Sequence, residues 1–130
     1  STRAPQWTGG GMVFAPVPRD YSFKMNKKEK RAALKSALTS RVQANKLIVL
    51  DQLTMDAPKT KAMQNVLNSL NVNKALVVTK ENDANVVLSA RNIPDVKTAL
   101  VNTINVYDVM KYNTVVLTKD AVAAIEEVYA

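Results

Sequence analysis

Residues 75–79 read ALVVT, a short continuous apolar run of the kind that forms a strand buried on both faces of a sheet. Two similar runs are LIVLD at 47–51 and TVVLT at 114–118, and we predict one more strand at 98–101. Segments with helical spacing or helix start signals lie between these runs. Strands that alternate with helices predict right-handed crossovers and parallel strands. The sequence therefore predicts an α/β fold, a three-layer sandwich around a mostly parallel four-stranded sheet.

The segments before, between and after the strands predict five helices. The expected ranges are about 26–45, 58–70, 86–91, 106–112, and a last helix with Asp120 in its first turn that ends at Tyr129. Asn26 and Glu29 have the N-x-x-E spacing that starts a helix. In this first helix Leu34, Leu38 and Val42 recur every fourth residue, which predicts a stripe facing the core.

Charge is distributed unevenly along the chain. The net charge is +7, and residues 1–46 hold ten Lys or Arg against two acids, so this third alone carries +8. Residues 47–130 carry −1. Such an asymmetry indicates that one end of the molecule engages a polyanion, and nucleic acid is the expected class.

The first 25 residues are expected to form an extended, basic arm, with residues 26–130 as the globular domain. The arm has no helical or strand periodicity, and it contains all three glycines and the single tryptophan. Its aromatic residues are interleaved with cations, and rings stack on splayed bases while cations neutralise phosphates. The alternatives without RNA contact are that Trp7 is a packing anchor and that the glycine run 9–11 is a flexible hinge.

The cationic character continues into the first helix. Lys27, Lys30 and Arg31 lie seven residues before Leu34, Ala37 and Leu38, so the stripe that is apolar later is cationic here. Their long stems could instead cover the rim of the core. With the arm beside them, RNA contact is the better interpretation. The predicted RNA-binding residues are Arg3, Trp7, Gly9, Gly10, Gly11, Arg19, Lys24, Lys27, Lys28, Lys30, Arg31 and Lys35.

Residues suited to catalysis are scarce. The chain has no cysteine and no histidine, which removes the commonest metal ligands and the usual general base. Sites in α/β sheets form beyond the carboxyl ends of strands, which here offer Asp51, Thr79 and Thr118. No motif for a nucleotide, a metal or a nucleophile accompanies them, so we expect no cofactor and no catalysis. The alternative is a small α/β enzyme or nucleotide-binding domain with an incidental basic arm.

Five short segments carry more specific information than the composition does. They are RAPQW at 3–7 with the glycine run, PRDY at 18–21, KK at 27–28 leading to ALKSAL at 33–38, APKTK at 57–61, and ARN at 90–92. On these residues the whole chain resembles the bacterial-type large-subunit ribosomal protein number four, the L-four family. The resemblance implies a globular α/β domain on the outside of the large ribosomal subunit, with a long loop reaching into its RNA and toward the peptide exit tunnel.

The same resemblance implies partners and a place in the cell. The partners are large-subunit ribosomal RNA, neighbouring large-subunit proteins and, as in some members, the leader of the protein's own messenger RNA. The implied location is the cytoplasmic ribosome, without a membrane. In the family a further segment, with half of the loop, a strand and a helix, precedes these residues. The chain is therefore expected to lack its amino-terminal segment, and residues 1–25 to be the second half of the loop.

Overall fold

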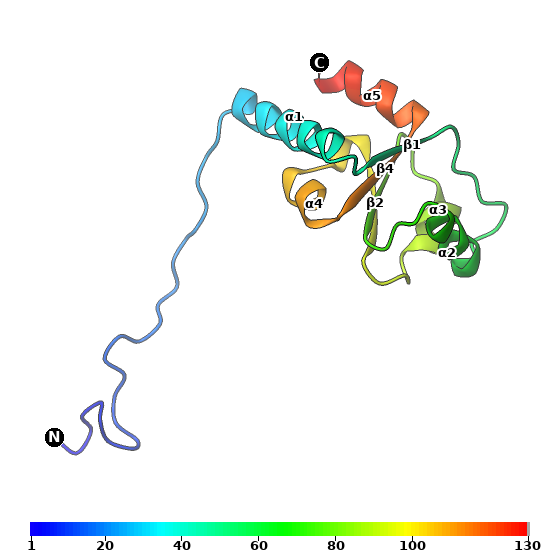
Figure 1. Cartoon of the computed structure of the whole chain (residues 1–130). Helices are drawn as coiled ribbons and strands as arrows, with labels where there is room; N and C mark the ends of the chain where they lie inside the picture. Colours follow the sequence, from blue (N-terminus) through cyan, green and yellow to red (C-terminus); the bar gives the residue numbers. More distant parts are fainter. Residues whose placement is uncertain (130) are drawn as a thin grey trace.

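The sheet has four parallel strands in the order β1-β4-β2-β3 (Figure 1). The computed structural model describes residues 1–129. The strands are β1 (Leu47–Leu50), β2 (Ala75–Thr79), β3 (Val96–Leu100) and β4 (Thr114–Thr118). The predicted α/β class is confirmed, and the sheet is wholly parallel rather than mostly so. The prediction of 114–118 and 75–79 matches β4 and β2 residue for residue.

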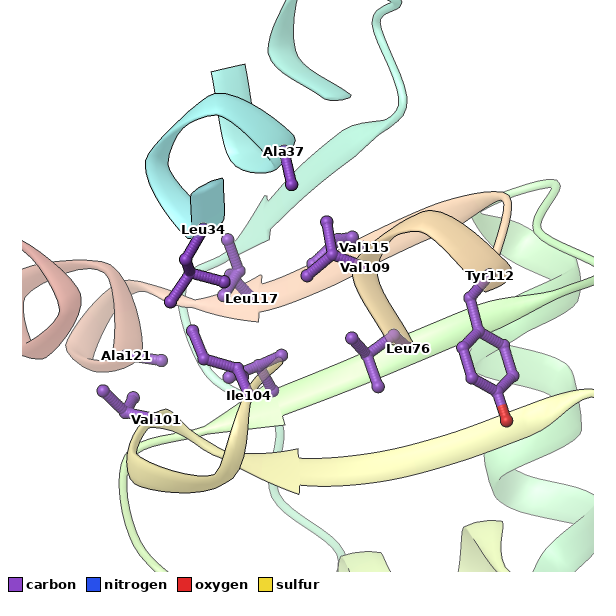
Figure 2. Packing of buried hydrophobic residues seen from close by; sticks show 11 residues of the cluster. Leu34, Ala37, Leu76, Val101, Ile104, Val109, Tyr112, Val115, Leu117 and Ala121 are labelled. Carbon is purple, nitrogen blue, oxygen red and sulfur yellow. The ribbon is translucent and has the colours of Figure 1, made fainter. Parts of the chain in front are cut away.

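Helices cover both faces of this sheet, as a three-layer sandwich requires. They are α1 (Lys27–Gln43), α2 (Thr60–Ser69), α3 (Ala84–Ala90), the short 3-10 helix η1 (Val101–Thr103), α4 (Val106–Lys111) and α5 (Lys119–Tyr129). One core, which includes Leu76 and Val115, lies under α1, α4 and α5 (Figure 2). The other, which includes Val77 and Val116, lies under α2 and α3. Alternate residues of β2 and β4 therefore serve opposite cores, which explains their continuous apolar sequences.

Strand β1 differs from the prediction that it is buried on both faces. It lies at the edge of the sheet, where β4 is its partner through the pair Leu47 and Val115. Val49 is consequently 50% exposed. The apolar run LIVLD indicates a strand but does not reveal strand order. In the structure β4 inserts between β1 and β2, and this leaves β1 at the edge of the sheet.

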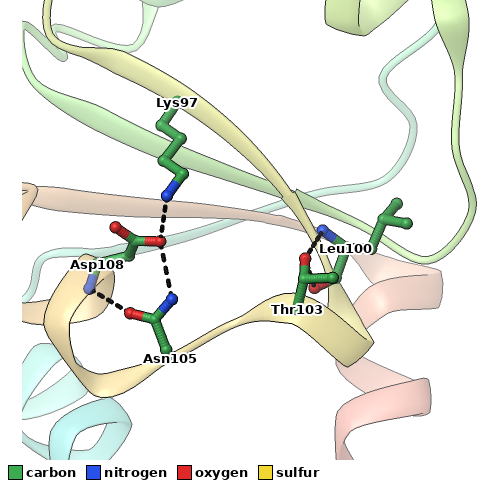
Figure 3. Close-up of polar contacts among 5 residues, drawn as sticks. All are labelled: Lys97, Leu100, Thr103, Asn105 and Asp108. Carbon is green, nitrogen blue, oxygen red and sulfur yellow. Dashed lines mark hydrogen bonds and ion pairs between the residues drawn. The ribbon is translucent and has the colours of Figure 1, made fainter.

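The third strand begins earlier than predicted. It spans Val96–Leu100, while Val101 starts η1. The backbone N–H of Leu100 donates to the Thr103 hydroxyl oxygen at 3.0 Å (Figure 3). This side-chain acceptor closes the turn and ends the strand one residue sooner than the apolar pattern indicates.

A polar cluster ties α4 to the sheet's other edge (Figure 3). Asn105 caps α4 by accepting a hydrogen bond from the backbone N–H of Asp108 at 2.8 Å. The buried Asp108 carboxylate accepts from Asn105 Nδ2 at 3.1 Å and from Lys97 Nζ at 2.6 Å. Because a buried carboxylate is costly without partners, these two donors make the placement of α4 on β3 possible.

The amino-terminal arm and the carboxyl-terminal helix α5 are placed very differently. The amino-terminal arm leaves the domain at α1 and extends away from it (Figure 1). At the other end Tyr129 faces inward and its hydroxyl donates to the Val101 carbonyl at 3.3 Å, while Val128 is 44% exposed. The spacing of the last helix allows either Val128 or Tyr129 to face inward, and in the structure it is Tyr129.

Candidate nucleic-acid interface

The tip of the arm is folded, contrary to the expectation of a uniformly extended segment. Residues 1–11 make a series of turns in which the backbone N–H of Trp7 donates to the Ala4 carbonyl at 3.0 Å. The N–H of Gly10 donates to Trp7 at 2.9 Å, and that of Gly11 to Arg3 at 2.9 Å. These bonds give the tip a defined shape, with the Trp7 side chain 59% exposed. Trp7 is therefore not anchored in the domain core.

The glycine run takes part in these turns and is not simply a hinge. Gly9 has a φ of +77°, a conformation that side chains disfavour. A Cβ on Gly10 would lie 2.0 Å from the Ala4 carbonyl oxygen, so the position admits only glycine. At Gly11 the nearest such atom is 3.7 Å away, an ordinary contact. The hinge interpretation is wrong for Gly10, which the turn requires.

The middle of the arm holds a cation stacked on a ring. The guanidinium carbon of Arg19 lies 4.1 Å from the centroid of the Tyr21 ring, and both side chains are exposed. Between them, the Asp20 carboxylate accepts a hydrogen bond from the backbone N–H of Ser22 at 2.9 Å. This bond lowers the pKa of Asp20 below its ordinary value. The one acid of the arm is thus used in a local turn, and it leaves Arg19 free of an ion pair.

The first half of α1 carries five of the predicted residues, and all five are exposed. They are Lys27, Lys28, Lys30, Arg31 and Lys35. Lys27, Lys28 and Lys30, in the first turn, oppose the helix dipole, an effect of roughly 0.3–1 kcal/mol per charge at low ionic strength that falls off beyond that turn. Glu29 offsets part of this, because its carboxylate accepts a hydrogen bond from the backbone N–H of Asn26 at 3.1 Å. An arrangement that costs helix stability indicates a use outside the helix.

From Leu34 onward one face of α1 packs on the core, with one change from the prediction. Leu34 and Ala37 are buried and Leu38 is half-buried, but Val42 is 57% exposed. Arg41 takes the inward position instead. The helix turns by about 100° per residue, so the inward stripe follows the spacing i, i+3, i+4, i+7 and passes through 41 rather than 42.

The predicted cations have no carboxylate partners in the described part of the chain. Within residues 1–129 the single ion pair joins Lys97 to Asp108, far from the arm in sequence. Arg3, Arg19 and Lys24 on the arm are therefore available to an external anion, as are the exposed cations of α1. They do not form one contiguous run in the sequence but are distributed along the arm and the first part of α1, and Figure 1 shows the arm extending away from the domain. A linear array of exposed cations suits a phosphate backbone.

A hollow next to α1 brings two of these cations together with Leu34 and with Ile104 and Val106, which the sequence analysis did not single out. It measures 330 Å³, and its walls include Lys30, Arg31, Leu34, Ile104, Val106 and Tyr129. Its members come from three distant parts of the chain, so no local spacing could indicate it. Of its apolar members, Leu34 was expected on the core-facing stripe of the first helix, and the spacing of the last helix allowed either Val128 or Tyr129 to face inward.

The carboxyl ends of the strands do form a second hollow, as expected of an α/β sheet. Asp51, Thr79 and Thr118 all line it, and its volume is also 330 Å³. Glu81, Asp83 and Asp120 add further acids to its wall. Asp83, however, caps α3 by accepting from the backbone N–H of Asn85 at 2.9 Å. In the described part of the chain no three acids are grouped so that they could hold a metal ion.

The comparisons with known proteins agree on one family. A family profile described as "Ribosomal protein L4/L1 family" matches residues 1–128. "Large ribosomal subunit protein uL4" of Lachnoclostridium phytofermentans is 70% identical over 130 residues, which is 100% of this chain and 63% of the relative. The proteins of the same description from Agathobacter rectalis and Lachnospira eligens are 68% and 63% identical, with the same coverage. The chain thus spans 63% of the length of these relatives.

Proposed function

Because the chain belongs to the ribosomal protein L4/L1 family, we propose that it is a structural constituent of the large ribosomal subunit that binds large-subunit ribosomal RNA through its arm and the projecting half of α1. The proposal assigns it no catalytic step. The resemblance noted from the sequence is confirmed by the family match and by relatives named as large-subunit proteins.

The observation that carries the RNA-binding proposal is the line of unpaired, exposed cations from Arg3 to Lys35, beside exposed rings. Trp7 and Tyr21 are 59% and 76% exposed, and Phe14 and Phe23 are 93% and 81% exposed. Large apolar side chains at this exposure mark a surface that another molecule covers. Cations to neutralise phosphates together with rings to stack on bases are what single-stranded and looped RNA requires.

The arm's shape supports a role inside folded RNA rather than on a smooth helix. Residues 12–26 contain no helix or strand, and they carry the folded tip away from the domain (Figure 1). We place the arm in a crevice of the large-subunit RNA, reaching toward the peptide exit tunnel, where it supports assembly of that RNA. The α/β domain then remains at the surface, in contact with neighbouring large-subunit proteins.

This proposal places the protein in the cytoplasmic ribosome. Among residues 1–129 no helix is long and apolar enough to cross a bilayer. The leader of the protein's own messenger RNA is a second RNA partner within the same proposal, since contacts to phosphates do not depend on sequence.

Directed cleavage of RNA tests the placement of the arm. The chain has no cysteine, so a single introduced cysteine gives one attachment point for an iron chelate that generates hydroxyl radicals. We expect Thr8→Cys, at the folded tip, to cut large-subunit RNA at a small set of nucleotides in reconstituted subunits. Asn65→Cys, exposed on α2 at the opposite side of the sheet, is the matched control. Equal and diffuse cleavage from both positions would contradict the proposal.

A further inference from the structure

The hollow between α1, α4 and α5 is apolar inside and cationic on one wall. Leu34, Ile104 and Val106 supply aliphatic surface, and the Tyr129 ring supplies aromatic surface. Lys30 and Arg31 stand on the α1 side and are exposed. No carboxylate is among the lining side chains that the structure describes.

The walls of this hollow are held in place by the fold. Leu34 and Ile104 are 5% and 7% exposed and belong to the core under α1 (Figure 2). The Tyr129 hydroxyl donates to the Val101 carbonyl at 3.3 Å, which fixes the ring against η1. Asn105, the remaining lining residue, is engaged by Asp108. A space whose walls are already ordered receives a ligand with little further loss of entropy.

The chemistry of the hollow fits one kind of occupant. Its volume of 330 Å³ lies at the lower end of the roughly 300–1,000 Å³ range of ligand pockets. The occupant needs a planar or apolar body for the interior and negative charge for Lys30 and Arg31. A nucleotide of a bound polynucleotide has both, because its base is a flat ring and its phosphates flank it.

We propose that this hollow receives an unstacked nucleobase of the RNA, stacked against Tyr129, with Lys30 and Arg31 on the flanking phosphates. The inference rests on the proposed RNA-binding function and adds a base-binding subsite on the globular domain. It also gives the cationic part of the α1 stripe a defined task. The hollow at the carboxyl ends of the strands cannot serve in this way, because its acids repel phosphate.

The test fills the hollow and leaves the charges unchanged. Val106→Phe places a larger side chain in the space, while Val42→Phe makes the same substitution at a 57% exposed position at the other end of α1. Binding to large-subunit ribosomal RNA is measured over a range of salt concentrations for both variants, for the parent chain and for the Lys30→Gln/Arg31→Gln variant. Melting temperatures are recorded alongside.

We expect Val106→Phe to weaken binding about tenfold, since stacking of one base contributes a loss of this size when removed. Its salt dependence should equal that of the parent, because every phosphate keeps its cation, whereas the double Gln variant should show a flatter dependence. Val42→Phe should bind as the parent does. If Val106→Phe does not fold, Tyr129→Leu, which removes the ring and keeps an apolar residue, replaces it with the same expected loss.

The outcomes separate the two proposals. A folded Val106→Phe or Tyr129→Leu variant that binds RNA as tightly as the parent overturns the base-binding subsite and leaves the RNA-binding function standing. A variant with normal RNA binding that fails to enter reconstituted subunits indicates that the hollow receives a protein side chain, which also overturns it. A parent chain that does not bind the RNA at all overturns both.

Discussion

Arg41 donates a hydrogen bond from its Nε to the backbone carbonyl of Val109 at 2.9 Å, and so joins the end of α1 to the end of α4. Its Nη2 donates to the next carbonyl, of Met110, at 2.8 Å. These carbonyls belong to the last turn of a short helix, whose C-terminal carbonyls lack partners within the helix and carry partial negative charge. One cation of the basic third of the chain is thereby committed to the fold and is not available to RNA.

Replacing Arg41 should reduce stability and leave RNA affinity nearly unchanged. Arg41→Met keeps much of the apolar stem but loses two charge-assisted hydrogen bonds, so we expect a loss of about 1–3 kcal/mol in the free energy of unfolding. Chemical denaturation provides the measurement. The neighbouring Val42→Ala, at an exposed position, should change stability by less than about 0.5 kcal/mol. A larger loss for Val42→Ala than for Arg41→Met would mean that the inward stripe passes through 42 after all.

RNA binding should depend strongly on salt. If five or six of the exposed cations neutralise phosphates, counterion release gives a slope of log affinity against log salt of roughly −4 to −5. Titrations of the parent chain with large-subunit RNA at several salt concentrations measure it. A slope near zero with affinity intact would refute the electrostatic account of the arm and of α1.

The stripe along α1 should separate stability from binding. Leu34→Ala removes a 5% exposed side chain and should lower the free energy of unfolding by about 2–5 kcal/mol. Leu38→Ala should lower it less, because Leu38 is only half-buried. Replacing Lys27, Lys30 and Arg31 together by Gln should change stability little and flatten the salt slope by nearly one unit for each phosphate that is no longer neutralised. Melting temperature and RNA affinity are measured for both variants. Early melting with normal binding in the triple Gln variant would show that these cations cover the core rim instead.

The tip of the arm should be sensitive at Gly10 and tolerant at Gly11. Gly10→Ala puts a Cβ 2.0 Å from the Ala4 carbonyl oxygen, so the turn must open, whereas Gly11→Ala meets only an ordinary contact. We expect Gly10→Ala to weaken RNA binding without lowering the melting temperature, because the tip lies away from the domain. Equal binding by both variants would indicate that the folded shape of the tip is not used.

The ion pair between Lys97 and Asp108 should stabilise the folded state at neutral pH, and this stabilisation should be lost at alkaline pH. The hydrogen bond to Asp108 raises the pKa of Lys97 above its ordinary value. A raised folded-state pKa gives a contribution that is fully present below the ordinary lysine pKa and is lost as the pH rises through the folded-state pKa. Lys97→Met should therefore be less stable than the parent at neutral pH, and the difference should shrink above about pH 10.5. Lys97 is 48% exposed, so we expect the part of the difference that disappears in alkali to be no more than about 1 kcal/mol. A difference that stays constant up to strong alkali would show that charge is not its source.

The sequence predicted the fold well where local pattern decides and less well where distant segments meet. The continuous apolar runs of β2 and β4 were sufficient, because both strands are central and both of their faces are buried. The run of β1 was equally apolar, yet its edge position depends on β4, which follows more than sixty residues later. Val42 was misplaced for a similar reason: Arg41 faces inward because the carbonyls of α4 accept from it, and α4 lies far along the chain.

The candidate site shows the same division. The cations and rings of the arm were identified from composition, since they need no partner within the protein. The folded shape of the tip was not predicted, because it depends on backbone hydrogen bonds that leave no periodic signal. The hollow of Ile104, Val106 and Tyr129 was also missed as a site, since each residue alone has the sequence pattern of an ordinary core position.

The order β1-β4-β2-β3 has a consequence for how the protein is made. Among residues 1–129, β4 alone bridges β1 and the other two strands, and it comes last of the four in the sequence. Until residues 114–118 emerge, β1 has no neighbour and the inward stripe of α1 has an incomplete floor. The cationic arm is complete long before that moment. Growing chains therefore expose a finished cationic segment on an unfinished domain, and a chain that stops before Thr114 should retain that segment on a domain that cannot close its sheet.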